Sequence, residues 1–385
     1  MSNNNDPSFI SPIPFSASAP PATETYPVDV HSPANEINQD QIRSLKSQGF
    51  TEGLARTLTD NNTNFPLRIW VVDNSGSMQM NDGHRMVATS AKNDIKLVNC
   101  TRWNEIRECV TYHVQMSALL EAPTSFRLLN HPGASVGTQQ FDIAQMGREA
   151  ISSDVQRAMD IMTKARPHGT TPLTQHVQDI YEIVHAMTPS LVSEGKRVVI
   201  VLATDGLPSN AHGETSQIEK NMFSNALKKL EGLPVWVVVR LCTDDDDVVE
   251  YYNSLDEQLE LSMDVLDDFV GEAKEVCDVN PWLNYALPLH RMREMGFHDR
   301  VFDMLDERAL TKAELRDFCR LLFGSSSFDG VRDPEVNFSG FLEDINNLLK
   351  KEDEQYNPVK GKVTPWINVS RLNKMYGNGG SCNIM

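Results

Sequence analysis

The chain has 385 residues, of which 40% are hydrophobic and 23% are charged, a composition typical of a folded globular protein. This excludes a collagen-like or mainly disordered chain, and no stretch approaches the roughly 20 apolar residues that a transmembrane helix needs. The net charge of −18 argues against DNA or RNA as the main partner, because cationic side chains must neutralise phosphates when a protein binds nucleic acid.

The N-terminal segment and the cysteines indicate the compartment. The first fifteen residues contain neither a basic segment nor the apolar core of a signal peptide. The six cysteines form no C-x-x-C pair of the kind that indicates a zinc site or a redox motif. We therefore expect a cytoplasmic protein. Residues 1–36, rich in Ser, Pro, Asn and Ala, are expected to form a disordered tail, because they bury too little apolar surface to offset the entropy of ordering.

Strand and helix patterns alternate through the middle of the chain. Three nearly continuous apolar runs are typical of buried parallel strands: 67–72, 197–203 and 234–241. Four amphipathic helical patterns lie between these runs: 102–120, 147–165, 173–188 and 217–230. The alternation predicts an α/β fold with a doubly wound, mostly parallel, Rossmann-like sheet.

Shorter signals predict two hairpins outside this alternation. Strand patterns near 125–129 and 136–141 are separated by His-Pro-Gly at 131–133, which predicts one hairpin. The segment 77–103 contains Asn-Asp-Gly at 81–83, a turn signal that indicates a second, smaller hairpin.

The chain becomes helical after about residue 278. Four helical patterns follow there: 283–295, 298–306, 312–322 and 339–352. The third begins with Thr311 and Glu314 in the spacing of a capping box. We therefore divide the chain as follows: a disordered tail (1–36), a helical leader interrupted by Gly49 (37–64), an α/β domain (65–275), a helical C-terminal region (280–353) and a flexible tail (354–385).

Oxygen-bearing side chains follow two of the predicted buried strands. Asp73, Ser75 and Ser77 come directly after the first apolar run, and Asp205 follows the second. A Gly-Thr-Thr-Pro-Leu segment at 169–173 opens a helix and adds hydroxyl groups. Because ligand sites of open α/β sheets gather outside the carboxyl ends of the strands, we expect these oxygens to converge on a hard cation such as Mg²⁺. The alternative is an ordinary strand-to-helix turn capped by Asp73.

The order of these segments, D-x-S-G-S, then Thr-Pro-Leu, then T-D-G, resembles the von Willebrand factor A (VWA) domain over roughly residues 65–275. In that family the pattern is the metal-ion-dependent adhesion site (MIDAS). The resemblance implies Mg²⁺ or Mn²⁺ held by five residues: Asp73, Ser75, Ser77, Thr171 and Asp205. Because the family's Gly-Gly-Thr is Gly-Thr-Thr here, Thr170 is the alternative to Thr171. The resemblance also implies a protein-binding, scaffold-type function, in which an open coordination position accepts an Asp or Glu of a protein partner.

Two other functions compete with this interpretation. A metal-assisted hydrolase would use the open position to activate water. However, Ser75 stands where haloacid dehalogenase-type phosphatases need a second Asp, and no G-x-S-x-G elbow is present, so we expect no catalytic residues and no enzymatic activity.

A ubiquitin-linked adaptor is suggested by Met-Gly-Phe at 295–297, which resembles part of a ubiquitin-associated domain. The alternative there is a glycine helix C-cap.

Two charged or reactive features remain. Residues 241–280 contain fourteen acidic residues and one lysine, and the four aspartates at 244–247 are expected at the same edge of the sheet as Asp205. They form either a second cation site or a helix N-terminus, where the helix dipole favours acids.

The last four residues, Cys-Asn-Ile-Met, fit a prenylation motif on Cys382 apart from the non-aliphatic Asn383, and a chance match is the alternative. A single farnesyl chain would give weak, reversible attachment to a membrane surface.

Overall fold

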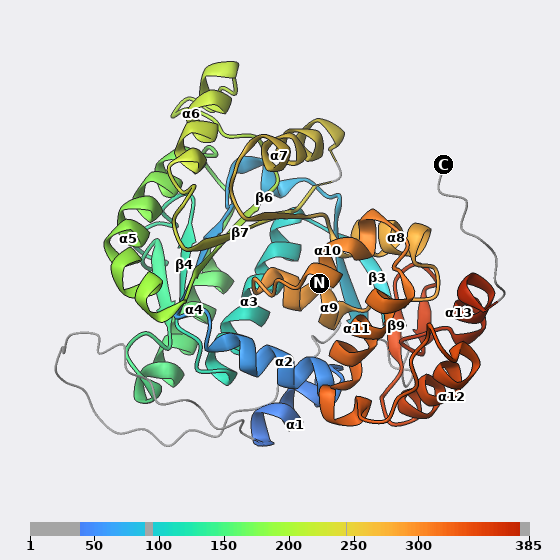
Figure 1. Ribbon diagram of the computed structural model, residues 1–385. Helices are drawn as coiled ribbons and strands as arrows, with labels where there is room; N and C mark the ends of the chain where they lie inside the picture. Colours follow the sequence, from blue (N-terminus) through green and yellow to red (C-terminus); the bar gives the residue numbers. More distant parts are fainter. Residues whose placement is uncertain (1–38, 89–94, 244, 378–385) are drawn as a thin grey trace, which may run out of the picture.

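The computed structural model describes residues 39–88, 95–243 and 245–377. A six-stranded sheet lies at the centre, in the order β5-β4-β1-β6-β7-β8 (Figure 1). Its strands are β1 (Leu67–Val72), β4 (Thr124–Leu128), β5 (Gln140–Ile143), β6 (Val198–Thr204), β7 (Val235–Leu241) and β8 (Met263–Leu266). Every neighbouring pair is parallel except β4 and β5. The predicted α/β class with a mostly parallel, Rossmann-like sheet is confirmed.

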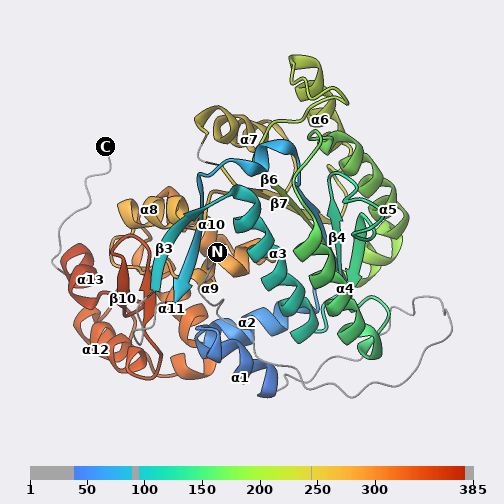
Figure 2. The ribbon, with the colours of Figure 1, turned by 180° about the vertical axis from the view of Figure 1, so that it is seen from behind.

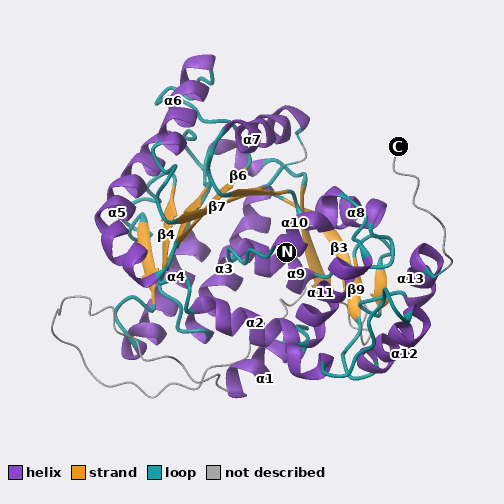
Figure 3. Cartoon of the chain, viewed as in Figure 1, coloured by secondary structure: helices purple, strands orange, loops and turns teal. Residues whose placement is uncertain are grey.

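Helices cover both faces of this sheet, which explains why its strands are apolar on both sides (Figure 3). Successive side chains of β1 alternate, so Trp70 and Val72 contribute to one core while Ile69 and Val71 contribute to the other. The first core is covered by α3 (Arg102–Leu119) and α4 (Ile151–Lys164), seen in front of the sheet in Figure 2. The second is covered by α5 (Leu173–Glu194), α6 (Gln217–Lys228) and α7 (Asp246–Gln258).

Both predicted hairpins are present, with shifted turns. β4 pairs with β5, but β5 begins at Gln140 rather than near residue 136. β2 (Gly83–Ala88) pairs antiparallel with β3 (Ile95–Cys100). The Asn-Asp-Gly segment leads into β2, whose first residue is Gly83, instead of joining the two strands. A Cβ atom on Gly83 would lie 2.9 Å from the backbone nitrogen of Arg102, so this glycine permits a close crossing of two backbones.

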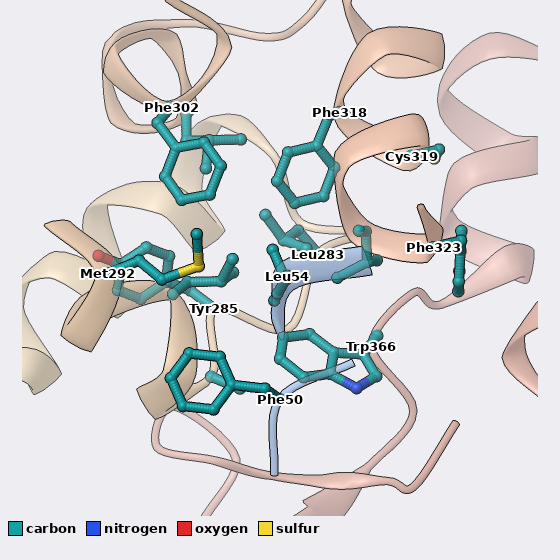
Figure 4. Packing of buried hydrophobic residues seen from close by; sticks show 14 of the residues in the cluster. Phe50, Leu54, Leu283, Tyr285, Met292, Phe302, Phe318, Cys319, Phe323 and Trp366 are labelled. Atoms are coloured by element: carbon teal, nitrogen blue, oxygen red, sulfur yellow. The ribbon is translucent and has the colours of Figure 1, made fainter. Parts of the chain in front are cut away.

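The leader and the C-terminal helices share one hydrophobic core (Figure 4). The leader forms α1 (Gln39–Ser47) and α2 (Glu52–Asn62). The later helices are α8 (Phe269–Val279), α9 (Leu287–Glu294), α10 (Arg300–Glu307), α11 (Lys312–Phe323) and α12 (Phe338–Leu349). Phe50 and Leu54 of the leader lie in the same cluster as Phe318 and Trp366. The capping box of Thr311 and Glu314 at the start of α11 is confirmed.

The expectation of a flexible tail over 354–385 is wrong for most of that segment. β9 (Gln355–Asn357) and β10 (Lys362–Thr364) form a hairpin, and α13 (Val369–Tyr376) follows. The side chains of Trp366 and Leu372 are buried in the core of the C-terminal helices, which accounts for the order. The predicted disordered tail (1–36) and Cys382 lie outside the described residues. Among the described helices, none combines the length and the apolar character needed to cross a membrane.

Candidate metal centre

The predicted site residues lie where β1 and β6 end side by side. The backbone N–H of Asp73, directly after β1, donates to the carbonyl of Ala203 in β6 at 2.8 Å. This bond extends the parallel ladder by one residue and brings the Asp73 side chain close to the loop that begins at Asp205. A short 3-10 turn (Gly76–Gln79) follows.

Four of the five predicted ligands form one hydrogen-bonded cluster. Ser77 Oγ donates to Asp205 Oδ1 at 2.9 Å, and Ser75 Oγ lies 3.0 Å from Ser77 Oγ. Asp73 Oδ1 accepts from the backbone N–H of Ser75 at 2.7 Å, and Asp73 Oδ2 accepts from Thr204 Oγ1 at 2.6 Å. The tertiary structure thus brings two carboxylates and two serine hydroxyls together from two loops. This is a set of oxygens that suits a hard cation.

A third loop packs against the first. The backbone N–H of Gly76 donates to the carbonyl of Gly169 at 3.2 Å, and that of His168 donates to Asn74 at 2.7 Å. Asn74 and Asn130 exchange two further bonds of 2.8 and 2.9 Å. Gly169 has a φ of +79°, and a Cβ atom there would lie 2.6 Å from Asn130 Oδ1. Only glycine fits this position without strain, so the glycine sets the approach of the third loop.

Both candidate threonines belong to this third loop. The backbone N–H of Thr171 donates to Ser209 Oγ at 2.9 Å, and the Thr171 carbonyl accepts from the Ser209 N–H at 3.0 Å. Thr171 is buried and Thr170 is half-buried. Within the described part of the chain, neither threonine hydroxyl is hydrogen-bonded to Asp73 or Asp205. Thr171 remains the better candidate, because Ser209 hydrogen-bonds both its backbone N–H and its backbone carbonyl.

Arg102 is a site residue that the sequence analysis missed. Its Nη1 donates to Asp205 Oδ2 at 3.0 Å, and its Nε donates to Asp82 Oδ1 at 2.7 Å. Arg102 is the first residue of α3, directly after the hairpin β2–β3 and the helix N-cap Thr101. No local signal connects it with Asp205, because 103 positions separate the two residues. One oxygen of Asp205 therefore faces Ser77 and the other faces a buried guanidinium.

The electrostatics of the cluster favour a cation. Burial and the neighbouring carboxylate of Asp205 raise the pKa of Asp73 to about 6, although the hydrogen bonds from Thr204 and Ser75 act in the opposite direction. Arg102 is an immediate positive partner of Asp205 but makes no hydrogen bond to Asp73 in the described structure. A divalent ion bound between the carboxylates would relieve this repulsion, and the donor set consists of oxygens, which suit a hard cation.

Asp245 to Asp247, the described part of the acidic run, lie at the start of α7 at the same edge of the sheet. Asp245 is the N-cap residue of α7 and accepts from the backbone N–H of Asp247 at 3.1 Å. The Asp245 N–H in turn donates to Thr243 Oγ1 at 3.1 Å. Asp244 lies outside the described residues. For Asp245 to Asp247 the geometry is that of a helix N-terminus.

The Met-Gly-Phe segment has the geometry of a helix C-cap at the end of α9. Gly296 has a φ of +81°, its N–H donates to Arg293 at 2.8 Å, and the Phe297 N–H donates to Met292 at 3.0 Å. Met295 and Phe297 are buried in the core of the C-terminal helices. Their side chains therefore contribute to packing.

Comparisons with known proteins give little guidance. No protein-family model and no curated protein matches the chain. Among solved structures, a mutant of the PilB minor pilin from Streptococcus sanguinis is similar at 16% identity and a TM-score of 0.34. The match covers 52% of this chain and 56% of the pilin, so this chain spans about half the length of that structure. A likeness this weak indicates neither a shared fold nor a shared function.

Proposed function

We propose that this chain is an intracellular protein-binding protein of the VWA type, whose MIDAS holds Mg²⁺ or Mn²⁺. The ligands are Asp73, Ser75, Ser77, Thr171 and Asp205, with Thr170 as the alternative to Thr171. The observation that supports this most is the hydrogen-bonded cluster of Asp73, Ser75, Ser77 and Asp205 at the carboxyl edge of a mostly parallel sheet. Such an edge is where open α/β folds bind ligands.

Hydrogen bonds within the chain would fix the positions of the two carboxylates before an ion binds. Thr204 and the Ser75 N–H hold both oxygens of Asp73, while Ser77 and Arg102 hold both oxygens of Asp205. Preset side chains lose little conformational entropy on binding. When bound, the metal would supply an open coordination position for a carboxylate of a protein partner.

The surrounding charge restricts the partner. Asp245, Asp246 and Asp247 lie at the start of α7, which follows β7 at the same edge of the sheet. They raise the local concentration of cations and penalise a strongly acidic ligand. The partner's Asp or Glu is therefore expected beside Lys or Arg.

Calorimetric titration of Mg²⁺ into the purified full chain tests the site. We expect one ion to bind to the wild type, and none to Asp73→Ala, because the central carboxylate is lost. The matched control is Asp160→Ala, which removes an exposed carboxylate of α4 and should bind as the wild type does. Equal Mg²⁺ affinities of Asp73→Ala and wild type would contradict the assignment.

Capture experiments test the binding function. A partner retained in Mg²⁺ should be lost without Mg²⁺, lost with Asp73→Ala and kept with Asp160→Ala. The competing hydrolase function predicts instead that phosphoesters or acyl esters are turned over in an Asp73-dependent manner. We expect no such turnover, since no nucleophile elbow surrounds Ser75 or Ser77.

A further inference from the structure

An ion pair connects the candidate metal centre with the hairpin β2–β3. Arg102 lies between two carboxylates: its Nη1 donates to Asp205 Oδ2 at 3.0 Å, its Nε donates to Asp82 Oδ1 at 2.7 Å, and its Nη2 donates to Asp82 Oδ2. Asp82 directly precedes β2, and Arg102 begins α3, two residues after the last residue of β3. One guanidinium therefore bridges a residue of the proposed ligand set and a residue at the base of the hairpin.

The backbone holds the two partners of this ion pair together. The backbone N–H of Arg102 donates to the carbonyl of Met80 at 3.0 Å. A Cβ atom on Gly83 would lie 2.9 Å from the Arg102 nitrogen, so the segment that carries Asp82 crosses close to the start of α3. The crossing keeps Asp82 within reach of the guanidinium while the guanidinium contacts Asp205.

Burial differs along the bridge. The side chains of Asp205 and Arg102 are 0% and 7% exposed, whereas the side chain of Asp82 is 42% exposed. Water therefore screens the charge of Asp82 more strongly than the charge of Arg102. An ion bound to Asp205 would experience a positive charge from Arg102 that Asp82 cancels only in part.

Arg102 has two opposing effects on ion binding. It holds one oxygen of Asp205 in place, which favours binding slightly because the side chain then loses less freedom when an ion binds. It also places a positive charge beside that carboxylate, and its repulsion of a divalent ion grows with the product of the two charges. Because the guanidinium is buried and poorly screened, the repulsion is the larger effect.

We infer that Arg102 and Asp82 together set the affinity of the candidate metal centre for a divalent ion, with Arg102 lowering the affinity and Asp82 raising it. The inference rests on the proposed function, because it concerns an ion bound between Asp73 and Asp205. Neither Arg102 nor Asp82 is a ligand in this arrangement. The three carboxylates and the guanidinium carry a net charge of −2, which one divalent ion neutralises. Loss of Arg102 makes this charge more negative, and loss of Asp82 makes it less negative.

Calorimetric titration of Mg²⁺ into the purified full chain, at neutral pH and constant ionic strength, tests this inference. Arg102→Met should bind Mg²⁺ at least about tenfold more tightly than the wild type, and Asp82→Asn at least about threefold more weakly. Arg102→Lys keeps the positive charge and should bind within about threefold of the wild type. A purely structural role of the ion pair predicts instead that Arg102→Met and Asp82→Asn both bind more weakly.

The controls separate this inference from the proposed function. Arg148→Met removes an exposed arginine that pairs with Glu121, and should bind as the wild type does. Circular dichroism shows whether each variant folds, and Asp82→Asn decides if Arg102→Met does not. Absence of Mg²⁺ binding by the wild type would contradict the proposed function and this inference together. If the wild type binds Mg²⁺ in an Asp73-dependent manner, unchanged or weaker binding by Arg102→Met, or unchanged or tighter binding by Asp82→Asn, would overturn this inference alone.

Discussion

At the scale of single residues, Asp73 is a fully buried carboxylate with a second carboxylate, Asp205, close by. Its pKa in the folded, metal-free protein is about 6, against an ordinary value of 3.8. The folded state therefore binds this proton more tightly than the unfolded state does. The resulting stabilisation is fully present below about pH 4 and is lost as the pH rises through about 6. The loss is on the order of 3 kcal/mol.

The pH dependence gives a test at this residue. Asp73→Asn should remove the loss of stability between about pH 4 and 6 and should be more stable than the metal-free wild type at neutral pH, because no buried carboxylate ionises. Urea unfolding in Mg²⁺-free buffer across this pH range measures the free energy of unfolding of the wild type and of Asp73→Asn. Asp160→Asn is the exposed control. A wild-type pH profile that persists unchanged in Asp73→Asn would show that other groups cause it.

The two neighbouring threonines allow a second test at residue scale. Thr171→Val keeps the shape of the side chain but removes the hydroxyl, and should lower Mg²⁺ affinity about tenfold or more, equivalent to about 1.4 kcal/mol. Thr170→Val should leave the affinity near that of the wild type, because Thr170 is only half-buried and is not held by Ser209. Calorimetry compares the two variants. The reverse outcome would assign the ligand to Thr170.

Between elements, α2 and α11 cross with their backbones close together at Gly53. A Cβ atom on Gly53 would lie 2.2 Å from the backbone nitrogen of Gly324 and 2.4 Å from the carbonyl oxygen of Leu321. Both are backbone atoms, so no side-chain rotation can make room. Gly53→Ala should force the helices apart and lower the free energy of unfolding by about 1–3 kcal/mol, measured with denaturant.

A control on the same helix makes this comparison specific. Asp60 is exposed near the end of α2, and Asp60→Ala should change stability by no more than about 0.5 kcal/mol. An equally small effect of Gly53→Ala would mean that α2 is held less closely against α11 than its backbone distances indicate.

For the whole molecule, the helical C-terminal region and the sheet share buried contacts. The core around α9, α10 and α11 also contains Met116 and Leu120 at the end of α3, together with Phe269 of α8. In addition, Arg240 of β7 pairs with Glu294 of α9. Removing one partner of a buried ion pair leaves an uncompensated charge. The two regions are therefore expected to stabilise each other.

Truncation tests this mutual stabilisation. A chain of residues 65–275 should unfold at a lower urea concentration than a chain of residues 39–377, and should bind a hydrophobic dye, because the apolar side chains of α3 and α8 become exposed. The longer chain should unfold in a single transition. Equal midpoints would show that the sheet does not depend on the C-terminal helices.

Farnesylation of Cys382 stays a prediction about the whole protein. A single lipid chain gives marginal anchoring, at about 0.8 kcal/mol for each buried methylene, so the protein should divide between membrane and cytosol. Intact mass of the protein from its own cells measures the modification. Cys382→Ser should release the membrane fraction, whereas Cys277→Ser, at a partly exposed cysteine of α8, should not. A mass that corresponds to the unmodified chain would reject the prediction.

The sequence alone was sufficient for the class of the fold and for the place of the candidate metal centre. Apolar runs, helical periodicity and the side chains that end a strand are local properties, so they can be read without knowledge of distant contacts. Because the runs before Asp73 and Asp205 both indicated parallel strands, the convergence of these carboxylates at one edge of the sheet followed from the strand direction. That β6 and β7 are neighbours in the sheet is a finding of the structure, because strand direction does not fix strand order.

Only the tertiary structure showed which distant residues complete these sites and cores. Arg102 reaches Asp205 through the geometry of an inserted hairpin, and Glu294 meets Cys109 across 185 positions of sequence. Likewise, Trp366 and Leu372 become ordered because the core of the leader and the C-terminal helices receives them. No periodicity or spacing encodes such contacts, since they depend on how separate elements pack and on the burial that each supplies to the other.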